Sequence, residues 1–392
     1  MIASSNVVST TLASEAPAVK PANRSYFPAL DGLRALAFVM VFGIHYMQLP
    51  WGWAGVDVFF VLSGFLITGI LFDTQDDPHR VRNFYIRRTL RIFPLYYGIM
   101  LAIALLYPIF HWEWNWTWLV WPAYLGNFAR AQHVLVRGSS LQRMADLALF
   151  SRTYPNFRLQ MGHFWSLCVE EQFYLIWPWV VFWVRDRKRL IYICLASVVV
   201  CPLMREVGSH TFPQFMLDQE VLDRWTPFRI DALLLGGLIA LVRRGPSPRG
   251  LLIAARCLFG VICIGIFAWA VFGPAARYDL DGYIYPRWHF TWGLTVIDLF
   301  AACLIVMAIE SGSLTFRVFS LRPLRWLGRI SYGAYVFHDI PHIEYYILGN
   351  RLNYHVKTSI AVIAFCGTLL LAWGSYRYFE SPFIRLKDRW AR

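Results

Sequence analysis

Charged residues are scarce in this sequence. Only 16% of its 392 residues are charged, whereas a soluble domain usually has about 25% charged residues. Hydrophobic residues make up 57% of the chain. So little charge on so apolar a chain excludes a soluble globular domain and predicts a polytopic membrane protein.

Cysteine is also scarce and scattered. The seven cysteines fall within apolar segments and show neither the spacing of a metal site nor that of a disulfide framework. We therefore interpret them as small apolar packing residues and expect no metal site. The net charge of +13 could indicate nucleic acid as a partner. In a helical membrane protein, however, excess Lys and Arg mostly set the topology, so we expect no nucleic acid.

Apolar runs of about 17 to 25 residues, the length of a membrane-spanning helix, recur along the chain. About ten can be marked, at residues 30–48, 54–72, 93–111, 163–184, 190–208, 226–242, 250–273, 289–309, 328–349 and 358–379. The run at 114–128 is short and contains Pro122, so we expect it to be interfacial or re-entrant. The sequence therefore predicts an all-α polytopic integral membrane protein with about ten transmembrane helices.

Lys and Arg predict the orientation of these spans. Most of the 37 Lys and Arg residues fall on one side of the membrane when both termini are placed in the cytoplasm, as the positive-inside rule requires. We expect a flexible cytoplasmic tail at residues 1–25, a transmembrane domain at 26–385 and a short cytoplasmic tail at 386–392.

Arg34 and His45 both lie inside the first apolar run. An ionisable residue at the bilayer centre costs roughly 2.5–3.5 kcal/mol even on lenient scales, so such residues usually mark a functional site. The two residues are eleven positions apart, which at about 100° per residue is roughly 20° beyond three full turns. They therefore share one helix face, about 16 Å apart along the axis.

A short turn joins the first two spans and brings His45 and Asp57 to a similar depth. A carboxylate beside an imidazole can hold the ring in one tautomer and raise its basicity. The alternative is a buried polar pair that only joins two helices. We favour the catalytic interpretation, because ionisable groups in a bilayer are usually functional.

Three arginines, Arg87, Arg88 and Arg91, begin the third span on the cytoplasmic side. Guanidinium groups bind phosphates with two parallel hydrogen bonds. Taken alone, such a basic loop more often sets topology or contacts anionic lipid. Arg34 faces the same side of the membrane, so the four arginines together could bind a phosphorylated cytosolic donor.

The fourth span opens with His163, Glu170 and Glu171 at an outer membrane boundary. Neighbouring helix residues point about 100° apart, so we expect one carboxylate to face the site and the other to face the helix packing. Favourable interaction with the helix dipole is the structural alternative for both. Arg229 and Asp231, which open a later span, could pair with these carboxylates.

Ser331, Tyr335 and His338 follow one another at spacings of four and three residues, which places them on one helical stripe. Such a stripe either lines a cavity or joins helices by hydrogen bonds, and the spacing supports both interpretations equally. Gly236 and Gly237 indicate a close helix contact rather than chemistry.

Seven segments occur in an order that resembles the membrane-integral acyltransferase-3 family, which includes bacterial O-acetyltransferases of polysaccharide, peptidoglycan and Nod factors. The resemblance covers residues 26–385, nearly the whole chain. The segments are 30–37 together with His45, 55–68, 84–94, 165–174, 229–232, 331–338 and 379–382.

The resemblance implies a ten-helix core in the bacterial plasma membrane that uses acyl-CoA, commonly acetyl-CoA, as a cytoplasmic co-substrate, with no permanently bound cofactor. It implies a hydroxyl of a carbohydrate or glycolipid as the acceptor. The family's Arg-x10-His motif corresponds to Arg34 and His45, and its arginine loop to Arg87, Arg88 and Arg91. Because about a dozen residues follow the last span, we expect the core to complete transfer alone or to hand over to another protein.

These expectations combine into one hypothesis about the site. The catalytic candidates are His45, Asp57, Glu170 and His338. The donor-binding candidates are Arg34, Arg87, Arg88, Arg91, Ser331 and Tyr335. The donor would extend along the face shared by Arg34 and His45, and His45 would take the acceptor's proton.

Several alternatives stay open. An acyl-enzyme on His45 or Ser331 would replace direct transfer, and the acceptor could be a small secondary metabolite. A transporter or flippase of a glycan precursor would also place charges at mid-membrane, but it predicts internal repeats, and the Arg34–His45 pattern does not recur in the second half of the sequence.

Overall fold

The computed structural model describes most of the chain from residue 26 onward. The described residues are 26–47, 49, 51–106, 119–128, 148–150, 157–213, 215–216, 220–246, 248–272, 288–343 and 354–391. The expected tail at 1–25 and residue 392 of the expected tail at 386–392 lie outside them, as does much of the segment between the third and fourth expected spans.

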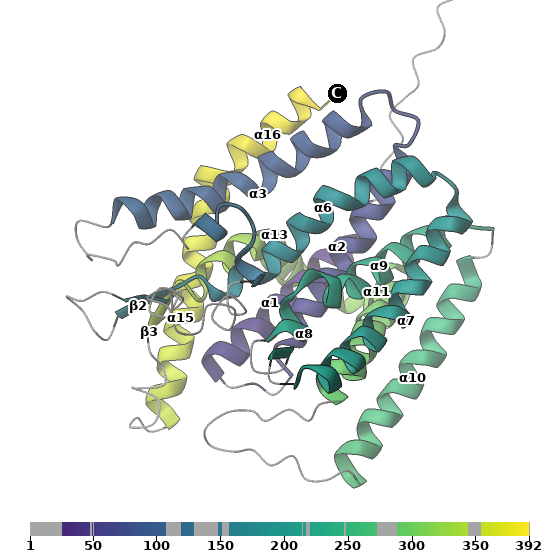
Figure 1. The fold of residues 1–392 in the computed structure, drawn as a ribbon. Coiled ribbons are helices and arrows are strands. Elements are labelled where there is room, and N and C mark those ends of the chain that lie inside the picture. The colour runs from purple at the N-terminus through teal and green to yellow at the C-terminus, as the bar shows by residue number, and fades with distance from the viewer. Residues whose placement is uncertain are drawn as a thin grey trace, which may run out of the picture.

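A bundle of helices makes up most of the described chain, as the sequence predicted, and one small sheet lies at its side (Figure 1). The first half comprises α1 (Pro28–Met47), α2 (Ala54–Asp73), α3 (Arg80–Leu105), η2 (Gly126–Phe128), β1 (Ala148–Phe150), β2 (Phe157–Gln160), η4 (Gly162–Phe164) and α6 (Trp165–Val184). The second half comprises α7 (Arg187–Thr211), α8 (Val221–Arg224), α9 (Thr226–Arg243), α10 (Pro248–Phe272), η6 (His289–Gly293), α11 (Leu294–Ile309), α12 (Leu314–Phe319), α13 (Arg322–Phe337), β3 (Pro341–Ile343), α15 (Tyr354–Gly374), η7 (Ser375–Glu380) and α16 (Ser381–Trp390).

Local capping chemistry starts several of these helices. The side chain of Asp186 accepts a hydrogen bond from the backbone N–H of Arg189 at 2.8 Å and caps α7. Ser313 caps α12 in the same way, and α9 has a proline in its first turn. These residues satisfy or remove backbone N–H groups that a helix start leaves without a partner.

α1 and α2 lie in the middle of the bundle, and glycines let neighbouring helices approach them closely (Figure 1). A Cβ atom at Gly64 in α2 would lie 1.7 Å from the carbonyl oxygen of Leu233 in α9. A Cβ atom at Gly236 in α9 would lie 2.0 Å from the carbonyl oxygen of Val61 in α2. Small residues allow such backbone contacts in membrane bundles, so the expected helix contact at Gly236 is confirmed.

Among the described residues, eight helices are long and apolar enough to cross a membrane. Of the other two expected spans, 163–184 corresponds to η4 and α6, whereas 328–349 overlaps α13 only as far as Phe337 and its last residues lie outside the described part of the chain. α6 carries Glu170, Glu171 and Gln172, and α13 has only 16 residues and begins with two arginines in its first turn. The polar residues of α6 and the short length of α13 therefore separate them from these eight helices.

The antiparallel sheet β1-β2-β3 joins the chain before α6 to the chain after α13. Leu159 in β2 pairs with Pro341 in β3, and Phe157 pairs with Ile343. This register brings the start of α6 next to the end of α13, although the two segments lie far apart in the sequence. His163 in η4 and the pair His338 and Asp339 thereby meet.

The close crossing of α2 and α9 generates a test of the fold. Gly64→Ala places a methyl group against the backbone of α9, and we expect this overpacking to cost about 1–3 kcal/mol of stability. Gly265→Ala in α10 is the matched control, because a Cβ there meets nothing within 4 Å. The thermal midpoint of the detergent-solubilised protein measures both, and equal midpoints in the two variants contradict the crossing.

Candidate active site

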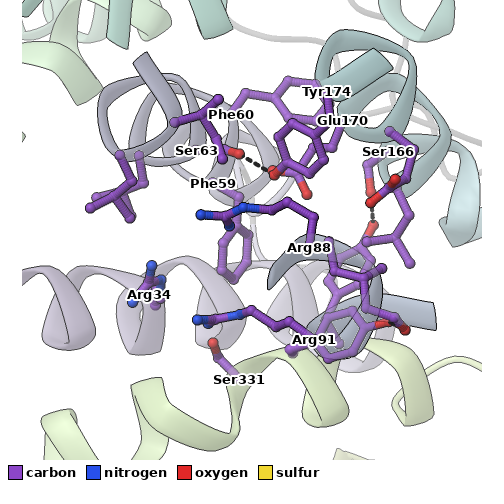
Figure 2. Close-up of a pocket in the computed structure, with 18 of the residues that line it drawn as sticks. Arg34, Phe59, Phe60, Ser63, Arg88, Arg91, Ser166, Glu170, Tyr174 and Ser331 are labelled. Carbon is purple, nitrogen blue, oxygen red and sulfur yellow. Dashed lines mark hydrogen bonds between the residues drawn. The ribbon is translucent and has the colours of Figure 1, made fainter. Parts of the chain in front are cut away.

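A pocket lies between α1, α2, α3, α6 and α13 (Figure 2). It encloses about 890 Å³ of space not filled by protein atoms, part of it open to solvent. Both apolar and polar side chains line it, and the polar ones carry the candidate chemistry. They are Arg34, Ser63, Arg88, Arg91, Ser166, Glu170, Glu171, Tyr174, Ser331, Tyr332 and Tyr335.

Three guanidinium groups gather in this pocket. Figure 2 shows Arg88 and Arg91 extending from α3 toward Arg34 on α1. Asp31 holds Arg34 from one turn earlier in α1, with Nη1 of Arg34 donating to Oδ1 of Asp31 at 2.8 Å. The guanidinium of Arg88 lies over the ring of Tyr174, 5.8 Å from its centroid. Guanidinium groups form charge-assisted hydrogen bonds with anions, and the carboxyl groups of Glu170 and Glu171 line the same pocket.

Arg87, the fourth expected donor-binding arginine, lies elsewhere. Its Nη2 donates to the backbone carbonyl of Ala391 at 2.6 Å, and Arg82 donates to the carbonyl of Trp390. These contacts hold the end of α16 against α3, and the two helices lie side by side in Figure 1. Arg87 therefore holds the end of α16 against α3. It does not line the pocket with Arg88, because neighbouring residues of an α-helix point about 100° apart.

Both carboxylates of the Glu170–Glu171 pair line the pocket. The expectation that one of them faces the helix packing was wrong. Glu170 and Glu171 point about 100° apart on α6, and the pocket is wide enough for both side chains to line it. Above Arg88 in Figure 2, Tyr174 and Ser63 share a hydrogen bond at 2.5 Å and form the wall beside Glu170.

Ser331 and Tyr335 line the pocket as well, which favours the cavity-lining interpretation of their stripe. The hydroxyl of Ser331 donates to the carbonyl of Gly328 at 2.8 Å. The hydroxyl of Tyr335 donates to the carbonyl of His163 at 2.7 Å and lies 2.5 Å from Oγ of Ser166. Ser331 is thus occupied by its own helix, while Tyr335 connects α13 to α6.

Three histidines, His45, His163 and His338, form a cluster next to Tyr335. The ring centroid of His338 is 5.1 Å from that of His45 and 5.0 Å from that of His163. Nδ1 of His338 donates to the carbonyl of Tyr335 at 2.6 Å, and its Nε2 is buried and meets no hydrogen-bond partner among the described residues. The side chain of His45 is 33% exposed, so a partner molecule can reach it.

Asp57 does not belong to this cluster. Its carboxylate is hydrogen-bonded to Arg229 of α9, and both side chains are buried. The expectation that Asp57 orients His45 was therefore wrong, because the charge of Arg229 at the α2–α9 crossing determines where Asp57 points. The carboxylate close to His45 is Asp339, with Oδ1 3.8 Å from Nδ1 of His45.

Arg229 and Asp231 also find different partners from those expected. Asp231 binds Arg205 of α7, whose Nη2 lies 2.8 Å from Oδ2 of Asp231. Both side chains are at most 1% exposed. These pairs join α2, α7 and α9 within the bundle and leave Glu170 and Glu171 to the pocket.

The pocket and the histidine cluster meet at one layer of side chains. Tyr335 and Ser166 line the pocket and contact His163, and Arg34 and Ser166 lie on opposite sides of the pocket in Figure 2. Among the described residues of α1, Arg34 alone lines the pocket. The described pocket therefore extends between α2, α3, α6 and α13 rather than along α1 from Arg34 to His45.

Residues 27–377 match the model of the acyltransferase 3 family, which is described as an acyltransferase domain. The chain belongs to this family. It is 29% identical over 387 residues to the peptidoglycan O-acetyltransferase OatA of Listeria monocytogenes, with 92% of this chain and 56% of that protein covered. It is 27% identical over 380 residues to the O-acetyltransferase OatA of Staphylococcus aureus, with 91% of this chain and 57% of that protein covered.

The chain spans little more than half the length of these relatives. No solved structure matches it. The match to the family confirms the resemblance inferred from the seven ordered segments, and the apolar helices agree with a multi-pass membrane protein.

The buried pair of Asp57 and Arg229 generates a second test. Arg229→Met leaves the Asp57 carboxylate buried without its partner, which we expect to cost about 3–5 kcal/mol of stability. Adding Asp57→Asn removes the uncompensated charge and should recover part of the loss. Thermal midpoints of the single and double variants measure the coupling, and a double variant no more stable than Arg229→Met would disprove it.

Proposed function

We propose that this protein is an O-acetyltransferase of the bacterial plasma membrane. It transfers an acetyl group from cytoplasmic acetyl-CoA to a hydroxyl group of a carbohydrate or glycolipid. The observation that supports this most is the pocket with three guanidinium groups on one side and a histidine cluster beyond the other.

The arginine side of the pocket suits the phosphates of coenzyme A. Guanidinium groups bind phosphate oxygens through charge-assisted, paired hydrogen bonds. Arg34, Arg88 and Arg91 come from two different helices, so the site exists only when α1 and α3 are packed together. The positive-inside rule favours the cytoplasm for this side of the protein.

The opposite side suits the reacting groups. Phe59, Leu62 and Leu167 supply apolar surface along the pocket for the pantetheine chain, and the thioester then reaches the layer of Ser166 and Tyr335. An acceptor hydroxyl that approaches His45 from outside would give its proton to the imidazole and attack the thioester. General-base help of this kind is worth about 10²–10⁴-fold.

The family relatives suggest the class of acceptor. One of them is named a peptidoglycan O-acetyltransferase, so a glycan of the cell envelope is the first acceptor to test. Purified protein in proteoliposomes, given radiolabelled acetyl-CoA inside and a soluble peptidoglycan fragment outside, should release an O-acetylated fragment. Absence of labelled glycan together with intact acetyl-CoA would contradict the proposed function.

Arg88 tests the donor site. We expect Arg88→Gln to raise KM for acetyl-CoA about 10- to 100-fold, because a charged hydrogen bond contributes about 1.5–3 kcal/mol. Acetyl-pantetheine lacks the phosphates, so the variant should turn it over at nearly the wild-type rate. The variant's preference for acetyl-CoA over acetyl-pantetheine should therefore be smaller than that of the wild type. Arg185→Gln is the matched control, since Arg185 is half-exposed and pairs with Asp76. An unchanged preference in Arg88→Gln would exclude phosphate binding there.

His45 tests the chemistry. We expect His45→Ala to lower kcat for acetyl transfer about 10²–10⁴-fold, with KM for acetyl-CoA little changed, because His45 does not line the described pocket. His210→Ala is the matched control, since His210 is exposed at the end of α7 and faces Glu206. Wild-type kcat in His45→Ala would exclude both the base and an acyl-histidine.

A further inference from the structure

One buried carboxylate faces two of the three clustered histidines. Oδ1 of Asp339 lies 3.8 Å from Nδ1 of His45, and Oδ2 lies 3.6 Å from Nδ1 of His163. The side chain of Asp339 is 2% exposed. A buried carboxylate costs several kcal/mol unless opposite charge and hydrogen-bond donors compensate it, and the two imidazoles belong to its surroundings.

His163 is the buried member of these two histidines. Its Nε2 lies 3.1 Å from the carbonyl oxygen of Val336, and its Nδ1 faces Asp339. Both ring nitrogens therefore face oxygen acceptors. Only the doubly protonated imidazolium has a donor at each nitrogen, so His163 fits as the cation that balances Asp339.

His45 fits a different role beside the same carboxylate. With Nδ1 directed toward Asp339, the ring proton belongs on Nδ1, and Nε2 keeps the lone pair that accepts a proton. The distance of 3.8 Å is longer than a hydrogen bond, and such catalytic contacts often tighten only when substrate binds. His45 is also the histidine of this pair with an exposed side chain.

We propose that Asp339 is the positioning residue for His45, and that His163 keeps Asp339 charged for this purpose. The inference rests on the proposed acetyl transfer and deepens it. The acceptor O–H gives its proton to Nε2 of His45, and the oxygen forms a bond to the thioester carbon. The C–S bond breaks, and the leaving thiolate takes the proton from the imidazolium, which yields the ester and free CoA.

The fold explains why this carboxylate reaches the histidines. Asp339 lies between the end of α13 and β3, and β3 pairs with β2 directly before His163. Tyr46, next to His45 on α1, donates its hydroxyl to the carbonyl of His338 at 2.7 Å. The two contacts hold α1, η4 and the end of α13 together around Asp339.

Asp339→Asn tests the proposal in the proteoliposome assay. We expect kcat to fall at least about 100-fold, as expected when a base loses its orienting carboxylate, with KM for acetyl-CoA within about twofold of wild type. Asp339→Glu keeps the carboxylate and should recover at least tenfold of that loss. Asp76→Asn is the matched control, since Asp76 is 93% exposed.

The outcomes separate the two proposals. A purely structural role of Asp339 predicts a lowered thermal midpoint and equal losses in the Asn and Glu variants, and that result overturns the inference. So does a kcat of Asp339→Asn within threefold of wild type. If Asp339→Asn does not fold, His163→Gln decides, with at least a tenfold fall in kcat at unchanged KM expected and no fall overturning the inference. Wild-type protein without acetyl transfer contradicts the proposed function itself.

Discussion

A charged side chain inside a bilayer has to be compensated by the protein, because lipid offers neither water nor counter-ions. This constraint determines the interior of the bundle. Arg229 binds Asp57, and Arg205 binds Asp231, all four buried among α2, α7, α9 and α11. Other charged side chains, on Arg34, Arg88 and Arg91 and on Glu170 and Glu171, border the pocket.

The same constraint places the proposed chemistry at a boundary. The pocket contains guanidinium and carboxyl groups, and the histidine cluster lies beyond Tyr335 and Ser166. A donor held by its phosphates and an acceptor from the other side of the membrane need to meet only at that layer. The two helices that depart most from an apolar span, α6 and α13, supply these side chains, so their polarity belongs to the site.

Local spacing in the sequence predicted much of this site. Arg34, Arg88, Arg91, Glu170, Ser331 and Tyr335, which were singled out from the sequence, all line the pocket. Arg88 and Arg91, and likewise Ser331 and Tyr335, lie at helical spacing and so share a face of their helix. His45 and His338 meet each other. Arg87 and Asp57 were misplaced, since each has a backbone or ionic partner on another element that its own helix does not reveal. Asp339 directly follows His338 in the sequence, and that adjacency was the one signal that could have found it.

The sequence by itself determined that the chain is a helical membrane protein and which family it belongs to. Composition, the length of apolar runs and the order of motifs are properties of the chain read along its length, so they need no fold. Only the tertiary structure decided which carboxylate faces which histidine. That choice depends on the pairing of β2 with β3 and on the glycine contacts between α2 and α9, which bring together residues far apart in the sequence. Partner selection among buried charges is therefore a property of the packed bundle, since each charge binds the opposite charge that packing brings within reach.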